Sequence, residues 1–304
     1  MTAIQLQNLT KRYNETLAVD TIDLTIERGE VFGFIGPNGA GKSTTIGMIL
    51  DLIRPTDGSI SVLGYDAQTE QRTIRKCVGI LPQQTGLFPR LTGIEHLRYA
   101  IDAHEDPNDS AAFLERVGLL DAGNDPVSTY STGMQQRLRL AIALVGEPDV
   151  LILDEPASGL DPGGIQRLSD IVTTERDRGT SVFFSSHGLD RVRSICDRVG
   201  VLVDGELAAV EAIQDSTEPT TSLRIVVDTN VDAVVAALDA HESVVSLTRV
   251  NGRNDRIAIR VTLGEPSEKA AVLRTAESAG RLVDFSIEDD ALESLYASAT
   301  EEAA

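Results

Sequence analysis

A glycine-rich segment contains the first residues whose types and spacing could do chemistry. Residues 36–44 read Gly-Pro-Asn-Gly-Ala-Gly-Lys-Ser-Thr and fit the pattern G-x-x-x-x-G-K-[ST] between an apolar strand and a helix. The glycines permit a tight turn, so successive backbone N–H groups and the helix N-terminus can face nucleotide phosphates. Lys42 would reach the β- and γ-phosphates, and the Ser43 hydroxyl would ligate Mg²⁺. The positions predicted to bind nucleotide are Gly36, Asn38, Gly39, Ala40, Gly41, Lys42, Ser43 and Thr44.

Two adjacent carboxylates follow the apolar run 150–153. A short apolar run between turns is typical of a buried strand, which would place Asp154 at the carboxyl edge of a sheet, beside the glycine-rich loop. There Asp154 can hold Mg²⁺. Glu155 can polarise or deprotonate a water for in-line attack on the γ-phosphorus. The loop alone indicates nucleotide binding, whereas the loop and the carboxylates together predict hydrolysis.

A helix start between these two motifs is a third candidate site. Residues 130–137 read Tyr-Ser-Thr-Gly-Met-Gln-Gln-Arg. The Ser131 hydroxyl and the backbone N–H groups near Gly133 favour an anion, because a helix N-terminus carries partial positive charge. Ser131 could instead be a plain N-cap that serves only its own helix. The residues alone leave both interpretations open.

The order of elements predicts the sheet that must position these groups. Strands are predicted at 4–9, 22–26, 31–35, 150–153, 180–185 and 198–203, and helices at 43–53, 164–178 and 188–197, with a helical region from 92 to about 146. Strands that alternate with helices imply a mainly parallel sheet covered on both faces.

A second, smaller domain is predicted after a polar linker at 216–221. Residues 222–304 read as strand, helix, strand, strand, helix and strand, which is the order of a ferredoxin-like α+β sandwich. A last helix is predicted at 289–298. This region contains no catalytic constellation.

The net charge of −20 limits the partners of the chain. An acidic surface repels the phosphates of nucleic acids and of anionic lipids, so neither is expected as the main partner. Lysine occurs only at Lys11, Lys42, Lys76 and Lys269, and every other basic residue is Arg. The composition fits an ordinary acidic cytosolic protein or a halophilic one, in which salt screens self-repulsion; we favour the halophilic interpretation.

Together the three motifs resemble the ABC-transporter ATPase family, over about residues 4–215. The resemblance implies an α/β P-loop ATPase domain at 1–215, with a mixed sheet and a helical subdomain at about 84–146. It also implies that ATP and Mg²⁺ are the cofactors. Residues 131–134 look like the family signature, so Ser131 and the Gly133 N–H would contact the γ-phosphate held by a partner copy. The active form would then be a homodimer with ATP at its interface.

Four further positions match family motifs. By resemblance, Gln83 would contact Mg²⁺ or water and sense the membrane subunit, and His187 would contact the γ-phosphate. Asp161 lies in the loop that crosses the dimer interface, and Tyr13 is placed to stack on adenine. With Glu155, the residues Gln83 and His187 complete the predicted catalytic set.

The signature departs from the usual Leu-Ser-Gly-Gly-Gln of the family. Thr132 replaces the first glycine, and Met134 replaces the glutamine. Because Thr has a Cβ and does not freely adopt positive φ, Thr132 must be right-handed. Ser131 and Gly133 remain, so the γ-phosphate contact is expected to persist, while any hydrogen bond of the usual glutamine is lost.

The subfamily resemblance is narrower. Residues 75–83, 87–92 and the signature are similar to single-domain ATPases of ABC-2-type exporters, which include drug and sodium efflux systems and the transporter of nitrous-oxide reductase maturation. Residues 289–296 loosely resemble the C-terminal helix of that group. The implied location is cytoplasmic, on the inner face of the membrane through integral permease subunits.

The leading hypothesis is therefore an ATP-hydrolysing subunit that dimerises around two ATP and powers an exporter. Two alternatives remain open: an importer ATPase, and a non-transport ABC ATPase acting on DNA or ribosomes. DNA-repair members insert long coiled coils between the motif halves, and only about ninety residues separate Lys42 from Ser131 here. Ribosome-acting members usually carry two ATPase domains, and the net charge of −20 also disfavours nucleic acid.

Overall fold

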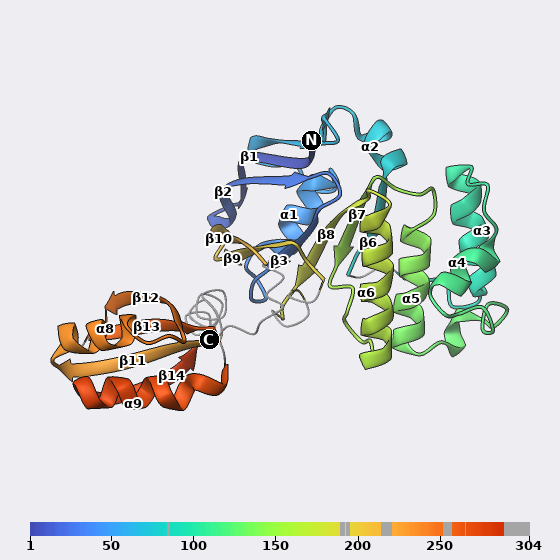
Figure 1. Cartoon of the computed structure of the whole chain (residues 1–304). Helices are drawn as coiled ribbons and strands as arrows, with labels where there is room; N and C mark the ends of the chain where they lie inside the picture. The colour runs from blue at the N-terminus through green and yellow to red at the C-terminus, as the bar shows by residue number, and fades with distance from the viewer. Residues whose placement is uncertain are drawn as a thin grey trace. The chain divides into compact units, whose positions relative to one another are not determined.

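The computed structural model describes residues 1–83, 86–188, 192, 195–213, 221–251, 257–264 and 266–288 (Figure 1). The chain divides into two compact units. The first comprises Met1–Ile213, and the described part of the second begins at residue 221. The first unit contains two sheets and the second contains one, and each unit has its own apolar core.

The larger unit is built on a six-stranded sheet. In sheet order its strands are β10 (Glu206–Ala212), β9 (Arg198–Val203), β3 (Val31–Ile35), β8 (Ser181–Ser186), β7 (Val150–Asp154) and β6 (Val78–Leu81). All neighbours pair in parallel except β10 with β9. Every residue of β3, β7 and β8 is buried, which explains their apolar runs. Because β3, β8 and β7 are parallel neighbours, their carboxyl ends lie at the same edge of the sheet.

A four-stranded antiparallel sheet completes the core on one side of helix α1 (Lys42–Ile49). Its strand order is β2 (Thr16–Glu27), β1 (Thr2–Tyr13), β4 (Asp57–Val62) and β5 (Tyr65–Asp66). Apolar residues of this sheet, of α1 and of the central sheet form one cluster that includes Leu6, Met48 and Phe34. The two strands predicted at 4–9 and 22–26 lie within the longer β1 and β2, whereas β4 and β5 are not predicted from the sequence.

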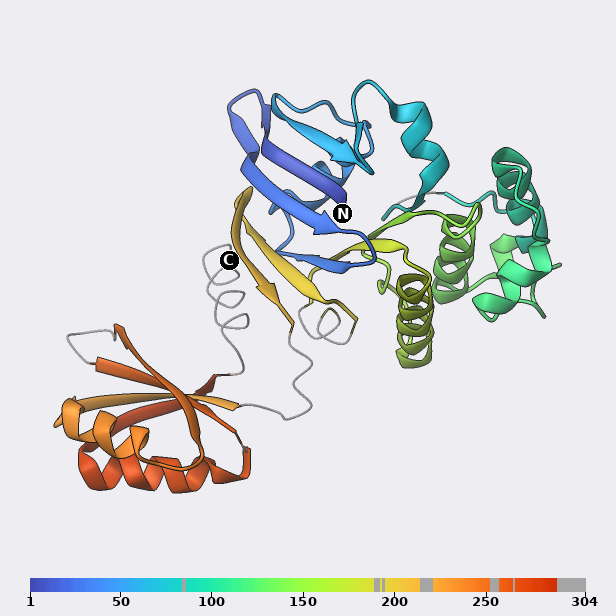
Figure 2. The same cartoon turned by 45° about the horizontal axis from the view of Figure 1, so that its top comes forward.

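Helices cover the other face of the central sheet and extend away from it. They are α3 (Gly93–His104), α4 (Ser110–Arg116), the 3₁₀ turn η1 (Val127–Thr129), α5 (Thr132–Ala143) and α6 (Pro162–Asp177). Helix α2 (Gln71–Cys77) packs instead on the side of α1, because its buried Ile74 belongs to the same apolar cluster as Met48 of α1. In both views α3 and α4 lie outside α5, away from the strands (Figures 1 and 2). A Cβ on Gly79 of β6 would lie 2.0 Å from the Ala143 carbonyl of α5, so this close helix–sheet contact requires glycine. Within the described residues, no helix has the length and apolar character needed to cross a bilayer.

Helix α1 ends earlier than the sequence pattern predicts. The pattern predicts a helix over 43–53, but α1 stops at Ile49 and Asp51 takes a positive φ of 52°. The N–H groups of Leu52 and Ile53 both donate to the Gly47 carbonyl, which closes the chain into a tight turn. The apolar residues after Ile49 therefore continue the pattern without continuing the helix. Half of the helix predicted at 188–197 lies outside the described residues.

The second unit is a four-stranded antiparallel sheet with two helices. Its elements in chain order are β11 (Thr221–Thr229), α8 (Val231–Asp239), β12 (Val244–Asn251), β13 (Ile257–Leu263), the 3₁₀ turn η2 (Pro266–Glu268), α9 (Lys269–Ala279) and β14 (Arg281–Glu288). The sheet order is β12-β13-β11-β14. The apolar face packs on α8 and α9 in one cluster that includes Ile225, Val234 and Val272. The helix predicted at 289–298 and nearly all of the linker predicted at 216–221 lie outside the described residues.

Candidate functional site

The glycine-rich loop joins β3 to α1 at the carboxyl edge of the central sheet. Gly41 has a φ of 105° and precedes α1 as its N-cap, and a Cβ there would lie 2.4 Å from the Ala18 carbonyl. Because Gly41 has no side chain, no side-chain cap occupies the first N–H groups of α1, which stay available to an anion. Ser43 is exposed and Thr44 is half-buried at this helix start, while Asn38 and Gly39 are exposed in the loop.

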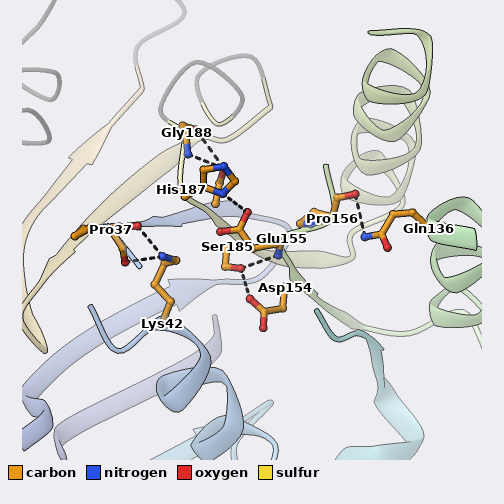
Figure 3. Close-up of polar contacts among 11 residues, drawn as sticks. Pro37, Lys42, Gln136, Asp154, Glu155, Pro156, Ser185, His187 and Gly188 are labelled. Atoms are coloured by element: carbon orange, nitrogen blue, oxygen red, sulfur yellow. Dashed lines mark hydrogen bonds and ion pairs between the residues drawn. The ribbon is translucent and has the colours of Figure 1, made fainter. Parts of the chain in front are cut away.

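Lys42 points back into its own loop. Its ammonium donates to the carbonyls of Gly36 at 2.6 Å and of Pro37 at 3.0 Å (Figure 3). Burial lowers the pKa of Lys42, and the nearby carboxylates of Glu155 and Asp154 act in the opposite direction. The structure therefore gathers the phosphate loop and both predicted carboxylates around one buried cation.

The two carboxylates extend from the end of β7 and are held by a residue of β8. Ser185 donates its hydroxyl to Asp154 Oδ1 at 2.6 Å and accepts the Glu155 N–H at 2.9 Å (Figure 3). Glu155 has a positive φ of 50°, in the left-handed region. Sequence reasoning misses Ser185, because only the pairing of β7 with β8 brings it opposite Asp154.

His187 lies next to Glu155. The ring nitrogen Nδ1 is 2.8 Å from Glu155 Oε2, and the His187 side chain is half exposed while that of Glu155 is buried. The imidazole can therefore orient this carboxylate, while half of the His187 side chain remains exposed. Of the predicted catalytic residues, the structure brings His187 and Glu155 into direct contact.

The helix start predicted to bind an anion is the N-terminus of α5. Ser131 is its N-cap, and its Oγ accepts the Met134 N–H at 3.2 Å. Thr132 is the first helical residue and has a negative φ, so the right-handed conformation expected for it is confirmed. Within the described residues, no hydrogen bond joins Ser131 or Gly133 to the phosphate loop. This helix start is therefore a separate part of the site.

A glutamine connects α5 to the loop that follows Glu155. Gln136 is buried, and its Nε2 donates to the Pro156 carbonyl at 3.2 Å (Figure 3). In the same loop, a Cβ on Gly159 would lie 2.8 Å from the Thr132 methyl group. The sequence pattern gives no signal for Gln136, because a polar residue in the first turns of an exposed helix is common.

Three further predicted site residues make no hydrogen bond to the two carboxylates within the described part of the chain. Tyr13, at the end of β1, is 44% exposed, with Lys11 Nζ 4.8 Å from its ring centroid. Asp161 is the N-cap of α6 and accepts the Gly164 N–H at 2.8 Å. Gln83 is exposed just after β6, and the two residues that follow it lie outside the described part of the chain.

An apolar groove lies beside Gln83. It has a volume of about 1250 Å³ and is lined by residues of α1, α2 and α3 and of the segment after β6. Phe88 and Tyr99 in its lining are 64% and 77% exposed. Large aromatic side chains that face solvent around a groove are typical of a protein-binding surface.

Comparisons with known proteins agree with this geometry. A family model described as ABC transporter matches residues 19–158. The linearmycin resistance ATP-binding protein LnrL of Bacillus subtilis is 37% identical over 212 residues, which are 68% of each chain. The daunorubicin resistance ATP-binding protein DrrA3 of Streptomyces coeruleorubidus is 34% identical and covers 92% of this chain and 89% of its own. A solved dimeric ATP-binding cassette bound to ADP and Pi in a post-hydrolysis state aligns with a TM-score of 0.63 and 26% identity, over 69% of this chain and 99% of that one.

Replacing Gln136 tests the link between α5 and the carboxylate loop. We expect Gln136→Met to lower the free energy of unfolding by about 1–3 kcal/mol, because the buried Pro156 carbonyl loses its donor. The matched control is Gln135→Met, since Gln135 donates to the Tyr130 carbonyl at 3.3 Å but is only half-buried, where water can replace it. We expect the control to change the free energy by less than about 0.5 kcal/mol. Urea unfolding of both variants is the measurement, and equal losses would contradict the buried link.

Proposed function

The chain belongs to the ATP-binding subunits of ABC transporters, and from this premise we propose that two copies close around two ATP molecules and power an exporter of the ABC-2 type. The chain is an ATPase. The main support for the proposal is that Lys42, Asp154, Glu155 and His187 lie together at one sheet edge. Each phosphate-binding half-site would be completed by the α5 start of the other copy.

ATP would be held by the phosphate loop and the N-terminus of α1. The uncapped N–H groups of α1 and the Lys42 ammonium would face the β- and γ-phosphates. Lys42 would exchange its bonds to the Gly36 and Pro37 carbonyls for bonds to phosphate oxygens. The exposed ring of Tyr13 would stack on adenine.

A magnesium site fits the residues present. Mg²⁺ prefers oxygen ligands from carboxylates, hydroxyls and water, and Asp154, Ser43 and Gln83 supply ligands of that kind. Asp154 is buried and has one oxygen fixed by Ser185, while its Oδ2 accepts no hydrogen bond from the described residues. When bound, the ion would neutralise charge that develops on the phosphates.

Glu155 would accept the proton of the attacking water, and His187 would hold that carboxylate in place. The 2.8 Å contact between His187 Nδ1 and Glu155 Oε2 supports this division of roles. General bases act within hydrogen-bond reach of the proton they remove, so a carboxylate held at a fixed point is better suited to the task. The half-exposed ring of His187 would then contact the γ-phosphate.

Dimerisation is supported by the position of the α5 start. Ser131 and Gly133 lie at the N-terminus of a twelve-residue helix, where N–H groups favour an anion. This helix start makes no hydrogen bond to its own phosphate loop among the described residues, so we assign it to the γ-phosphate of the partner copy. Asp161, at the start of α6 in the neighbouring loop, would lie at the same interface.

A membrane permease would bind in the apolar groove beside Gln83. The exposed Phe88 and Tyr99 give this groove the apolar surface that an amphipathic segment of a partner needs. Gln83 lies two residues after the end of β6, and it would couple binding of the permease in the groove to the metal site. The chain would thus be attached to the inner face of the membrane through its partner.

Export is favoured over the alternatives by the relatives. LnrL and DrrA3 are both named as resistance ATP-binding proteins, and DrrA3 aligns with 92% of this chain, well beyond residue 213. A net charge of −20 disfavours DNA or ribosomal RNA as the partner. A compound of the kind named for these resistance proteins is therefore the class of cargo that we propose.

We further propose that the second unit is a ferredoxin-like domain. Its element order is strand, helix, strand, strand, helix and strand. Its sheet order, β12-β13-β11-β14, places the first and third strands at the centre, and all pairs are antiparallel. The two helices pack on one face of that sheet.

Blocking hydrolysis tests the proposed mechanism. We expect Glu155→Gln to bind ATP but to lose at least 100-fold in kcat, because an amide does not accept the proton of water. With saturating Mg-ATP the variant should run as a dimer in gel filtration, and with ADP it should run as a monomer. A variant that stays monomeric with Mg-ATP would contradict dimerisation around ATP.

The two roles of Ser131 can be separated. Ser131→Ala should lower the free energy of unfolding by about 1 kcal/mol through loss of the N-cap. Ser131→Asp keeps the cap but places a negative charge where the γ-phosphate of the partner would lie. In the Glu155→Gln background, we expect Ser131→Asp to unfold like its parent in urea and to lose the ATP-dependent dimer. A dimer as stable as that of the parent would refute the contact across the interface.

Salt adaptation is proposed from the charge of the chain. With a net charge of −20, self-repulsion destabilises the compact state, and salt screens it. We expect the melting temperature to rise steadily as KCl increases from dilute buffer to molar concentration. Thermal unfolding followed by circular dichroism measures this, and a melting temperature independent of KCl would argue for an ordinary acidic protein.

A further inference from the structure

We infer that Ser185 is a positioning residue whose single hydroxyl fixes the carboxylate of Asp154 and the backbone of Glu155 in the ATPase site. The inference rests on the proposed roles of Asp154 and Glu155, and it adds a residue that no motif in the sequence marks. Ser185 touches neither nucleotide nor metal in this proposal. It acts through the two acidic residues that do.

The pairing of β7 with β8 brings Ser185 next to Asp154. Strands β7 and β8 are parallel neighbours, and Asp154 pairs with Ser185 in their register. The Ser185 Oγ lies 2.6 Å from Asp154 Oδ1, to which it donates, and 2.9 Å from the Glu155 nitrogen, from which it accepts (Figure 3). A hydroxyl has one hydrogen and two lone pairs. Because its hydrogen is directed to Asp154, only a lone pair remains for the Glu155 N–H, so the two bonds fix one orientation.

The burial of Ser185 shows that its hydroxyl has a specific use. Ser185 is 0% exposed and directly follows the buried apolar residues Val182, Phe183 and Phe184 of β8. A buried hydroxyl is unfavourable unless it is hydrogen-bonded, and alanine would fill nearly the same volume without that requirement. The hydroxyl is therefore retained at this position for the bonds that it makes.

For Asp154, the bond to Ser185 sets which oxygen faces outward. Oδ1 is occupied by the hydroxyl, so the carboxylate cannot rotate freely about its last torsion. The other oxygen would thereby be held available to the proposed metal ion. Partners of this kind, which orient a metal-binding carboxylate without touching the metal, typically change metal affinity or activity 10–100-fold when removed.

For Glu155, the hydrogen bond from its N–H to Ser185 stabilises an unfavourable backbone conformation. A φ of 50° is uncommon for a residue with a Cβ and persists only where the surroundings enforce it. The Glu155 N–H is anchored on Ser185, and its carboxylate reaches His187 Nδ1 at 2.8 Å. Loss of the anchor would let the backbone relax and would move the carboxylate away from His187.

The test compares two serines of the same strand. Ser185→Ala removes the hydroxyl at the site, and Ser181→Ala removes a buried hydroxyl at the other end of β8, where it accepts the Gly29 N–H at 3.0 Å. We measure kcat, the KM for ATP and thermal stability of the full chain. Mn²⁺ binding in the presence of ADP, followed by the electron paramagnetic resonance of free Mn²⁺, gives a readout independent of turnover.

We expect Ser185→Ala to lower kcat 10–100-fold and to weaken Mn²⁺ binding about 10-fold. ATP binding in EDTA should remain as in the wild type, because Lys42 and the α1 N-terminus are untouched. Ser181→Ala should show wild-type kcat and Mn²⁺ binding with a similar loss of thermal stability. The two variants would then lose similar thermal stability, but only Ser185→Ala would lose kcat and Mn²⁺ binding. A serine with a purely structural role would not produce this difference.

The outcomes that overturn the inference are distinct from failure of the proposed function. If Ser185→Ala keeps wild-type kcat and Mn²⁺ affinity, or if Ser181→Ala loses both to the same extent, Ser185 has only a structural role. Asp154→Asn and Glu155→Gln are measured alongside. If Asp154→Asn retains Mn²⁺ affinity and Glu155→Gln retains kcat, the assigned roles of the carboxylates are wrong, whatever Ser185→Ala shows.

Discussion

Two consecutive carboxylates are buried at the carboxyl edge of the central sheet. The surrounding structure compensates their negative charge and supplies a hydrogen-bond partner for the Glu155 backbone N–H. Asp154 is 6% and Glu155 is 7% exposed. Carboxylates so far removed from water require compensating partners. The partners are the Lys42 ammonium, the Ser185 hydroxyl and the His187 ring, contributed by the segments that follow or end β3 and β8. The strand order β3-β8-β7 is therefore a condition for the site, because only this order brings these segments next to the carboxylates.

The same carboxylates are connected to the surface that would meet a second copy. Glu155 begins a loop whose next carbonyl, that of Pro156, accepts a hydrogen bond from Gln136 of α5. Further along this loop, Gly159 packs on Thr132 at the start of α5, and Asp161 caps α6. A movement of Glu155 would thus displace the helix start that is proposed to bind the partner's γ-phosphate. Hydrolysis and dimer opening can be coupled through these short contacts without any long-range rearrangement.

The parts of the fold that the sequence predicts well are those set by local pattern. The strand at 31–35 and the loop after it follow from a five-residue apolar run and a glycine motif, and β3 has those bounds. Asp154 at the end of β7 follows from the same kind of signal. Ser185 and Gln136 are not predictable in this way, because their roles depend on which strands and helices become neighbours. The early end of α1 is also missed, since Leu52 and Ile53 keep the apolar pattern while their N–H groups turn back to Gly47.

The charge of the chain constrains how a nucleotide can be bound at all. With a net charge of −20, the surface as a whole repels ATP, and at about 0.1 M salt that repulsion is screened beyond about 10 Å. Attraction must then come from groups close to the phosphates, where screening by salt is weak. The protein supplies it with backbone N–H groups at the α1 start and with the single buried ammonium of Lys42, neither of which adds exposed positive charge. The acidic surface and the anion-binding loop are therefore compatible, because the binding energy is local and the repulsion is diffuse.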